Sequence, residues 1–335
     1  MRKLVEVIKI DEVIKHPNAD SLDICKIGGW NVITRINEYK AGDIALYAQI
    51  DSWIPSTIAP FLSRDHEPRI YNDVPGERLK TIKLRGEVSQ GLLLSPSLLS
   101  TDYNLGDDVS DLLGIQKWEP IETFGCEEQR STFPSWARKT DQERIQSCFN
   151  TIKELLANGL SDDWTVEEKL EGSSMSVGSF DNDPVICSRN MSLKLDCKSK
   201  YVETAKSYNI IEKLNSNIMI SGELCGPGIQ GNIYNLSRPS WFIFDILDAD
   251  KQSIVSYETR EEIIKSFDLK LHQTPVIKEN FKIQDMTCQE LLEMAKGKSL
   301  LNYKQDREGL VFKNNANPNI SFKAINNDYL LKQKD

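Results

Sequence analysis

The chain has few of the residues that build disulfide frameworks or zinc sites. It contains three histidines in 335 residues, and its seven cysteines are scattered without a C-x-x-C pair. An odd and dispersed set of cysteines argues against a disulfide scaffold, and so few separated histidines argue against zinc. We therefore expect reduced cysteines that are mostly structural.

Long hydrophobic runs are also missing. No stretch of 18 apolar residues occurs, and the N-terminal sequence MRKLVEVIKIDEV alternates charged with aliphatic residues, unlike the apolar centre of a signal peptide. These absences predict a soluble cytoplasmic protein with no membrane partner and no obligate protein partner.

The chain lacks an excess of positive charge. Its net charge of -9 argues against binding nucleic acid by bulk attraction, because that requires many lysine and arginine contacts to phosphate. A local basic groove remains possible. Hydrophobic residues make up 39% of the chain, and 335 residues are enough for two domains that each bury a core.

Turn-rich sequence separates two differently patterned regions, so we expect domains at 1–115 and 131–335 with a connector at 116–130. The first region has short apolar segments between turn residues, which predicts a small OB-like β-barrel. The expected strands are Leu4–Ile10, Leu22–Ile27, Trp30–Ile36, Asp43–Ile50, Lys80–Leu84 and Gly91–Leu94.

The segment HPNADSLDICKIGGW, which starts at His16, resembles the opening of OB-type tRNA-binding domains. It is either a structural turn before a core strand or a nucleic-acid contact. Basic residues follow later in this domain, with Tyr71 among them, and they form either an RNA-binding face or a solvated edge. They are Arg64, Arg69, Arg78, Lys80, Lys83 and Arg85, of which Arg78, Lys83 and Arg85 are the candidates for RNA contact.

The second region mixes helical and strand patterns and predicts an α+β domain with mainly antiparallel sheets and flanking helices. Thr140 is the expected N-cap of its first helix. Lys139 and Arg144 beside it are either helix-surface charges or phosphate contacts. Further helices are expected at Lys200–Leu214, Arg260–Phe267 and Cys288–Lys296, and strands at Ile218–Leu224, Trp241–Leu247, Gly309–Lys313 and Ile320–Ile325.

The segment WTVEEKLEGSSMSVG, from Trp164 to Gly178, has the pattern of a hairpin, two strands joined by a tight turn. Lys169 lies at the end of the first strand. Glu171 lies two residues further on, and Gly172 permits a close approach of backbone to ligand. A lysine attacks phosphorus only when its amine is neutral, so nearby cations or a metal must lower its pKa. A solvated lysine on a hairpin is the alternative.

Charged residues interrupt several apolar strands downstream. Glu223 ends one run, Asp245 interrupts another, and Glu308 and Lys313 flank a third. A carboxylate on a buried strand is costly unless it is paired or binds a metal. These positions therefore indicate a polar site shared between strands.

The order of these motifs resembles that of the covalent nucleotidyltransferases, which include ATP-dependent ligases and capping enzymes. The resemblance spans Lys139 to Lys332, and GELCGPGIQGN and SFKAINNDYLLK are similar to RNA ligases in particular. An OB-type domain in front is similar to Deinococcus-type RNA ligases. Only a dozen residues follow Lys323, too few for the C-terminal OB domain of DNA ligases and capping enzymes. The matching segments are Lys169-Leu-Glu-Gly172, Ser188-Arg-Asn190, Ser221-Gly-Glu-Leu224, Phe242-Ile-Phe-Asp-Ile246, Glu308-Gly-Leu-Val-Phe-Lys313 and Ser321-Phe-Lys323.

The resemblance implies that Lys169 attacks the α-phosphorus of ATP, holds AMP and passes it to an RNA 5′-phosphate, which the 3′-hydroxyl then joins. It also implies a set of ATP contacts. Glu167 would contact the adenine edge, Phe242 would stack on the base or simply pack in the core, Arg189 would contact ribose or phosphate, and Lys313 and Lys323 would hold phosphates.

The same resemblance implies that Glu223, Glu308 and Glu171 hold Mg²⁺ or Mn²⁺ or its waters. Glu171 stands where the family more often has aspartate. The last motif is usually K-x-K, whereas Ser321 and Lys323 occupy it here, so the second lysine, with Lys332 as one possibility, stays open.

The expected function is thus an ATP-dependent RNA ligase acting on nicked duplex or broken RNA ends. A DNA ligase, a capping-type enzyme and a non-enzymatic RNA-binding protein are the alternatives. Which RNA is preferred, which metal is used, and the pathway and oligomeric state stay open.

Overall fold

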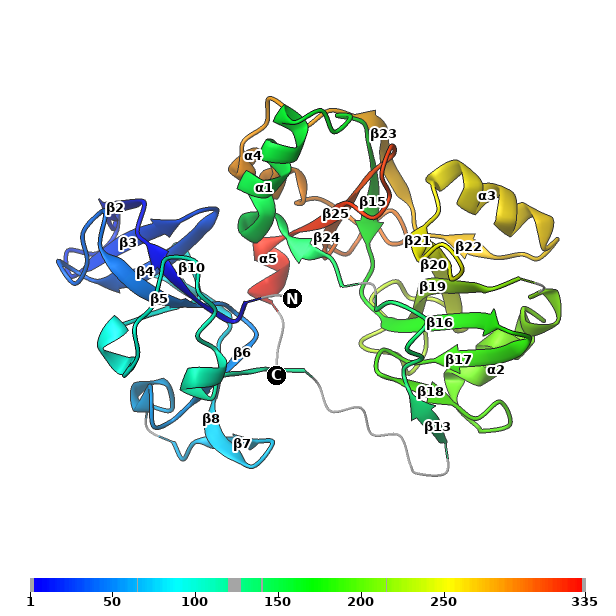
Figure 1. The fold of residues 1–335 in the computed structure, drawn as a ribbon, viewed down its shortest axis with the longest axis horizontal. Coiled ribbons are helices and arrows are strands. Elements are labelled where there is room, and N and C mark those ends of the chain that lie inside the picture. Colours follow the sequence, from blue (N-terminus) through cyan, green and yellow to red (C-terminus); the bar gives the residue numbers. More distant parts are fainter. Residues whose placement is uncertain (1–2, 65, 120–127, 140, 215, 333–335) are drawn as a thin grey trace. The chain divides into compact units, whose positions relative to one another are not determined.

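A computed structural model describes residues 3–64, 66–119, 128–139, 141–214 and 216–332 of the chain (Figure 1). The chain divides into two compact units. One contains residues 1–122 and 330–335, and the other contains residues 123–329. Each unit is described by itself below.

The first unit is built from short antiparallel strands around two clusters of buried aliphatic and aromatic side chains. The sheets have the orders β1-β5-β11, β2-β3-β4, β12-β6-β8-β7 and β10-β9. The predicted OB-like barrel is confirmed. Its strands are β1 Val5–Lys9, β2 Glu12–Lys15, β3 Leu22–Ile27, β4 Trp30–Arg35, β5 Ile44–Ala48, β6 Ser52–Pro55, β7 Arg69–Tyr71, β8 Val74–Arg78, β9 Thr81–Leu84, β10 Glu87–Gln90, β11 Leu92–Leu94 and β12 Gln116–Lys117, with 3-10 turns at Pro60–Leu62, Pro96–Leu98 and Asp111–Leu113.

The His-Pro-Asn-Ala-Asp turn of this unit has a structural task. His16 is buried, its Nε2 lies 3.1 Å from the carbonyl oxygen of Leu84, and its Nδ1 accepts a hydrogen bond from the Asn18 amide. The side chain of Asn18 donates to the Arg85 carbonyl at 3.0 Å. The turn between β2 and β3 is therefore tied to the turn between β9 and β10.

The second unit contains two larger sheets with helices packed against them. Its strands are β13 Gln129–Thr132, β14 Glu143–Arg144, β15 Trp164–Lys169, β16 Ser173–Phe180, β17 Asp183–Cys187, β18 Met191–Leu193, β19 Ile218–Cys225, β20 Ser240–Asp248, β21 Ser253–Ile254, β22 His272–Gln273, β23 Val276–Phe281, β24 Gly309–Asn314 and β25 Ser321–Ile325. Its helices are α1 Ile145–Ala157, α2 Lys200–Ser207, α3 Tyr257–Ser266, α4 Cys288–Met294 and α5 Asn327–Leu330, with a 3-10 turn at Ile211–Lys213.

One sheet has eight strands, in the order β13-β18-β17-β16-β19-β20-β21 with β22 also paired to β20. The other has five strands, in the order β14-β25-β24-β15-β23. Most pairs are antiparallel, and the apolar strands β19, β20 and β24 occupy interior positions. The predicted α+β architecture with antiparallel sheets is confirmed.

The predicted hairpin around Lys169 is wrong. β15 pairs with β23 and β24 in the five-stranded sheet, whereas β16 pairs with β17 and β19 in the eight-stranded sheet. The chain crosses from one sheet to the other at Gly172, where an added Cβ would lie 2.4 Å from the Leu224 carbonyl oxygen. Glycine permits this approach because it has no side chain. Alternation reveals strands but not their partners.

Several predicted helix bounds also differ, most clearly those of the first two helices. The first helix begins at Ile145 after an N-cap at Arg144, while the expected cap, Thr140, lies outside the described residues. The helix expected at Lys200–Leu214 ends at Ser207, and a separate 3-10 turn follows. Asn209 between them has a φ of 52°, a left-handed conformation that ends a helix.

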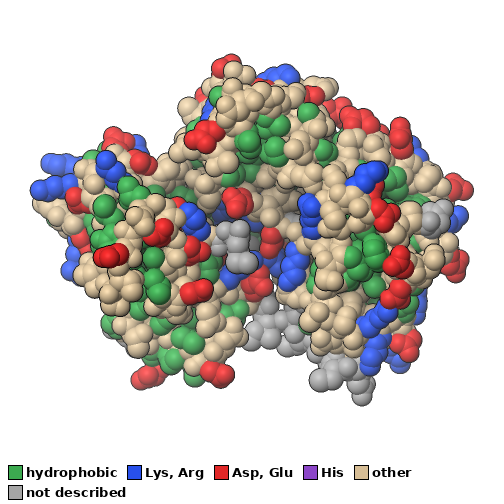
Figure 2. Space-filling view, in the orientation of Figure 1, with side chains coloured by type: hydrophobic (Ala, Val, Ile, Leu, Met, Phe, Trp, Pro, Cys, Tyr) green, Lys and Arg blue, Asp and Glu red, His purple; other side chains and the backbone are tan. Residues whose placement is uncertain are grey.

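Within the described parts of the chain, no helix combines the length and the apolar character needed to cross a membrane. On the face seen in Figure 2, acidic and basic side chains are interspersed on each unit. The visible surface thus has no single-sign field, as a net charge of -9 distributed among 41 basic and 50 acidic residues would suggest.

Candidate active site

Strand β15 has one apolar face and one polar face. Trp164 and Val166 are fully buried in the cluster beneath α1 and α4. Because side chains alternate along a strand, Thr165, Glu167 and Lys169 lie on the opposite face. The five-stranded sheet therefore presents the nucleophile candidate and Glu167 on the same side.

The side chain of Lys169 is paired with Glu308. Its Nζ lies 2.7 Å from Oε1 of that residue, and both side chains are largely buried. The pairing follows from the register, since Lys169 stands opposite Gly309, the first residue of β24. Burial opposes the charge on Lys169, but the carboxylates of Glu308 and Glu223 outweigh burial and raise the pKa of the amine. The side chain is therefore held as an ammonium.

Glu223 is contributed by β19 of the eight-stranded sheet, where it pairs with Ser174 and Phe242. Burial, opposed by Lys169 and assisted by Glu308 and Glu171, raises the pKa of this carboxyl to about 8. The described residues contain no ready-made group of three metal ligands. The surplus of acidic groups nevertheless fits a divalent cation, which would relieve their repulsion.

Around Lys323, positive charges are in excess. Lys323 stands opposite Val311 of β24 on one side and Arg144 of β14 on the other. Burial, followed by the charges of Lys169 and Arg144, lowers the pKa of Lys323 to about 7. Cations crowded in this way fit an anionic group such as a phosphate.

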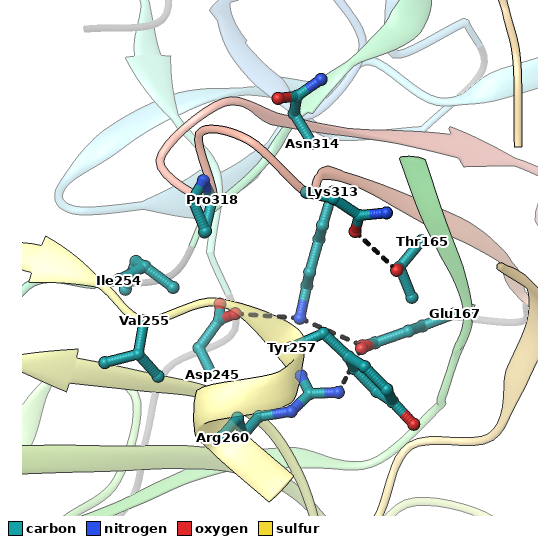
Figure 3. A pocket seen from close by; sticks show the side chains of 11 residues that line it. Thr165, Glu167, Asp245, Ile254, Val255, Tyr257, Arg260, Lys313, Asn314 and Pro318 are labelled. Atoms are coloured by element: carbon teal, nitrogen blue, oxygen red, sulfur yellow. Dashed lines mark hydrogen bonds and ion pairs between the residues drawn. The ribbon is translucent and has the colours of Figure 1, made fainter. Parts of the chain in front are cut away.

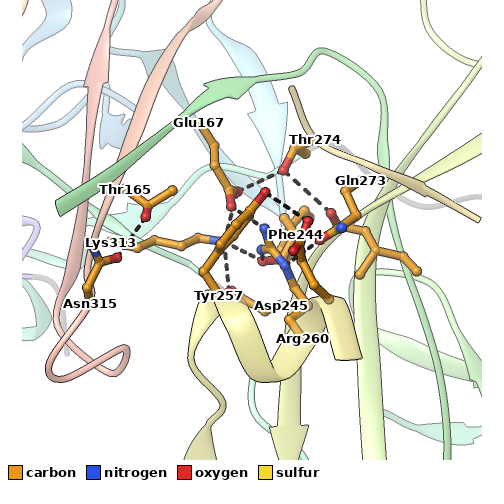
Figure 4. Close-up of polar contacts among 12 residues, drawn as sticks. Thr165, Glu167, Phe244, Asp245, Tyr257, Arg260, Gln273, Thr274, Lys313 and Asn315 are labelled. Atoms are coloured by element: carbon orange, nitrogen blue, oxygen red, sulfur yellow. Dashed lines mark hydrogen bonds and ion pairs between the residues drawn. The ribbon is translucent and has the colours of Figure 1, made fainter. Parts of the chain in front are cut away.

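Glu167 is the centre of a buried cluster of four charged side chains (Figure 4). Arg260 on α3 donates to Oε1 at 2.5 Å, and Lys313 on β24 donates to Oε2 at 3.0 Å. Lys313 also lies 2.9 Å from Oδ1 of Asp245 on β20. Thr274 donates to Oε2 of Glu167 at 2.7 Å. We call Glu167, Asp245, Arg260 and Lys313 the ion quartet.

The ion quartet links the two sheets, because Glu167 and Lys313 belong to the five-stranded sheet and Asp245 to the eight-stranded one. Burial alone would raise the pKa of Glu167, but Arg260 and Lys313 outweigh it and lower that pKa. Both basic residues also donate to the Phe244 carbonyl oxygen. The charges balance, as buried charges must if they are not to destabilise the fold.

A small pocket adjoins the ion quartet (Figure 3). Its volume is about 10 Å³, room for roughly one water molecule. Thr165, Tyr257 and Asn315 also line it. The predicted contacts of Glu167 with adenine and of Lys313 with phosphate remain predictions, and in this structure both side chains are engaged with each other.

The other predicted contact residues of this unit have protein partners as well. Nη2 of Arg189 lies 3.0 Å from both carboxylate oxygens of Asp141, and Nζ of Lys139 donates to Asn190 at 2.7 Å. Phe242 is 5% exposed and packs in a cluster with Leu170. Its predicted stacking on a base and its alternative as a core residue both stay open.

The candidate RNA contacts of the first unit differ in character. Arg78 is paired with Asp51 at 2.6 Å, and its guanidinium lies 3.8 Å from the ring centroid of Trp118. Lys83 and Arg85 are exposed on β9 and in the turn after it. Arg78 therefore has a structural partner, while Lys83 and Arg85 present their charges to solvent.

The sequence analysis missed several side chains that contact the site. They are Arg260 and Thr274, which bind Glu167, and Tyr234 and Tyr329, which bind Glu171. A signal existed for Arg260, which is four residues before Ile264 and hence on the apolar face of α3. No local pattern marks the other three.

Replacing Glu223 by glutamine should change how stability depends on pH. A carboxyl whose folded pKa is raised to about 8 from 4.5 contributes stability below about 4.5 that is lost as the pH rises through about 8. We compare the free energy of unfolding of Glu223→Gln with that of the wild type in metal-free buffer. As the pH rises from 5 to 8, we expect this difference to shift in favour of the variant by at least about 1.4 kcal/mol, or roughly 2–4 °C in Tm. Thermal melts at both pH values measure this.

The matched control is Glu262→Gln, a change at an exposed position of α3. It should leave the pH dependence of Tm unchanged. Parallel melting curves for wild type and Glu223→Gln across this range would contradict the assignment of a buried, repelled carboxyl.

Comparison with known proteins agrees with this fold. Residues 162–325 match the RNA ligase family, and residues 4–96 match an OB-fold domain. The phenylalanine–tRNA ligase beta subunit of Geobacter metallireducens is 28% identical over 128 residues, which cover 33% of this chain. The match spans 14% of that subunit's length, so it supports a shared module and not a shared activity.

Solved structures of Naegleria gruberi RNA ligase match the whole chain. The complex with PPi is 35% identical, with a TM-score of 0.89 and coverage of 100% of both chains. A variant of that ligase with ATP and Mn also has 35% identity, a TM-score of 0.89 and full coverage of both chains. Because a ligase that is 35% identical matches the full length of this chain with a TM-score of 0.89, the chain belongs to the RNA ligase family.

Proposed function

We propose that this RNA ligase uses ATP to join RNA 3′-hydroxyl and 5′-phosphate ends, with Lys169 as the residue that carries AMP. The observation that carries the proposal is the convergence of Lys169, Glu308, Glu223 and Lys323 from both sheets. The structures of Naegleria gruberi RNA ligase with ATP and Mn and with AMP and Mn support it.

The first step forms a bond from Nζ of Lys169 to the α-phosphorus and breaks the bond to the β-phosphate, releasing pyrophosphate. An oxygen of the RNA 5′-phosphate then takes the AMP as the bond to Nζ breaks. In the last step the 3′-hydroxyl attacks the adenylated 5′-phosphate and AMP leaves. Each step is a transfer at phosphorus, so alignment and charge neutralisation are the protein's main contributions.

Lys169 must lose its proton before it attacks. Glu308 stabilises the ammonium at 2.7 Å, so the amine becomes nucleophilic only when that negative charge is engaged elsewhere. A bound Mg²⁺ or Mn²⁺ would supply this neutralisation and polarise the α-phosphate, with Glu223, Glu308 and Glu171 as the residues that would hold it or its waters. Lys323, adjacent to Lys169, is placed to receive the negative charge of a phosphate.

The roles of the remaining site residues follow the family resemblance. Glu167 contacts adenine, Arg189 contacts ribose or phosphate, Lys313 holds a phosphate, and Phe242 stacks on the base. For these contacts to form, the Arg189 pair with Asp141 and the ion quartet must rearrange. Lys139 and Arg144, and Lys83 and Arg85 on the OB-fold unit, are proposed RNA contacts, with Arg78 the weakest of these because it is already paired.

We propose nicked duplex RNA as the substrate and a Deinococcus-type arrangement, in which the OB-fold domain precedes the catalytic one. Sealing of nicks whose 3′-terminal sugar is ribose or deoxyribose tests this, because the 2′-hydroxyl distinguishes RNA from DNA. We expect the terminal ribose to accelerate sealing by at least about tenfold. Equal sealing of an all-DNA nick would indicate a DNA ligase, and covalent labelling by GTP in place of ATP would indicate capping chemistry.

A further inference from the structure

Glu171, the residue that replaces the family's more usual aspartate, is held at three points. The phenol of Tyr329 donates to Oε2 of its carboxylate, and the Glu171 amide donates to Oη of Tyr234 at 2.6 Å. The thiol of Cys225 donates to its carbonyl oxygen at 3.5 Å. Both tyrosines are at most 8% exposed. Residues distant in sequence therefore restrain both the backbone of Glu171 and its carboxylate.

The segment that carries Tyr329 is itself fixed to Glu308. The Asn326 amide donates to the Glu308 carbonyl oxygen at 2.9 Å, and the Asn326 side chain donates to the Arg307 carbonyl at 3.2 Å. The Asp328 amide donates to Oδ1 of Asn326 at 3.0 Å and starts the turn of α5. Tyr329 thus reaches Glu171 from a backbone whose position is set by Glu308.

A glutamate has one more rotatable bond than an aspartate, and its carboxylate lies about 1.5 Å further from the backbone. Unrestrained, that carboxylate would sample several positions. The hydrogen bond from Tyr329 selects one of them, close enough to Glu223 for the charge of Glu171 to help raise the pKa of that carboxyl. A hydrogen bond to a charged group is strong enough to favour one rotamer.

We propose that Tyr329 is a positioning residue, which holds the longer side chain of Glu171 so that its carboxylate serves the divalent metal as the usual aspartate would. This inference rests on the proposed function. It gives the NNDYL segment, which follows the last lysine motif, a role in positioning a residue of the active site.

The test measures Mn²⁺ binding by calorimetry in the presence of α,β-methylene-ATP, which cannot release pyrophosphate. Full-length wild type, Tyr329→Phe, Glu171→Asp and the double variant are compared. We expect Tyr329→Phe to weaken Mn²⁺ binding by about tenfold, the loss of one hydrogen bond to a charged group. Glu171→Asp restores the shorter carboxylate and should keep Mn²⁺ binding, and in that background Tyr329→Phe should cause no further loss, because the aspartate does not depend on the tyrosine.

The matched control is Tyr303→Phe, since Tyr303 is 74% exposed and should be neutral. Thermal melts separate folding from positioning. A Tyr329→Phe protein with lowered Tm but wild-type Mn²⁺ affinity would overturn the proposal, and so would an equal loss when Tyr329→Phe is made in the Glu171→Asp background. If Tyr329→Phe does not fold, Glu171→Gln decides, because unchanged Mn²⁺ binding in that variant means that the Glu171 carboxylate does not serve the metal.

The results that would contradict the role of Tyr329 differ from those that would contradict the proposed function. A wild-type protein that binds no nucleotide analogue and gains no label from ATP would contradict the proposed function itself. A wild-type protein that is labelled by ATP, beside a Tyr329→Phe variant with the same Mn²⁺ affinity, would contradict only the role of Tyr329.

Discussion

Replacing Lys169 by alanine is expected to reduce covalent labelling by α-labelled ATP by a factor of about 10³ or more. Loss of a nucleophile removes the step itself, and the remaining site can only bind the substrate. Lys169→Arg should be equally inactive, because guanidinium keeps the ion pair with Glu308 but does not deprotonate. The measurement is protein-bound label after denaturing electrophoresis.

The same variant should still seal RNA whose 5′ end already carries AMP. In that reaction the 3′-hydroxyl attacks directly, and no bond to Lys169 forms or breaks. Lys251→Ala, which removes a 79% exposed lysine side chain, is the control for loss of a lysine and should be labelled normally. Full labelling of Lys169→Ala, or no sealing of adenylated RNA by it, would contradict this assignment.

Replacing Arg260 by methionine is expected to destabilise the protein by about 3–5 kcal/mol at pH 7. It removes one cation from the ion quartet and leaves two buried carboxylates facing Lys313 alone, and an uncompensated buried charge is costly. Chemical denaturation or Tm measures the effect. Because the loss of Arg260 raises the pKa of Glu167, the deficit should shrink as the pH falls toward 5 and the carboxyl takes up a proton.

Combining Arg260→Met with Glu167→Gln should recover much of the stability, since the pair of Lys313 and Asp245 then balances alone. The control is Arg130→Met, which breaks an exposed pair with Asp183 and should cost at most about 1 kcal/mol. A double variant less stable than Arg260→Met would show that the contacts of Glu167, and not charge balance, govern this region. Lowered ATP binding in a stable double variant would support the proposed adenine contact.

Two strands show how much of the fold can be predicted from the sequence. The apolar run that contains Glu223 predicted an interior strand, and β19 is one. The alternation around Lys169 predicted two strands correctly, but not that they belong to different sheets. Local periodicity reports which face of a strand is buried, but it does not report that the partners of β15 are β23 and β24, more than a hundred positions along the chain.

The sequence by itself determined the chemistry: the order of Lys169, Glu223, Glu308 and Lys323 along the chain indicated a nucleotidyltransferase before any pairing was known. Only the tertiary structure decided which charges neutralise one another. It pairs Lys169 with Glu308 and Glu167 with Arg260, and it brings Tyr329 to Glu171. The physical reason is that a charge is recognisable in one residue, but its burial and its partner exist only after distant strands have packed together.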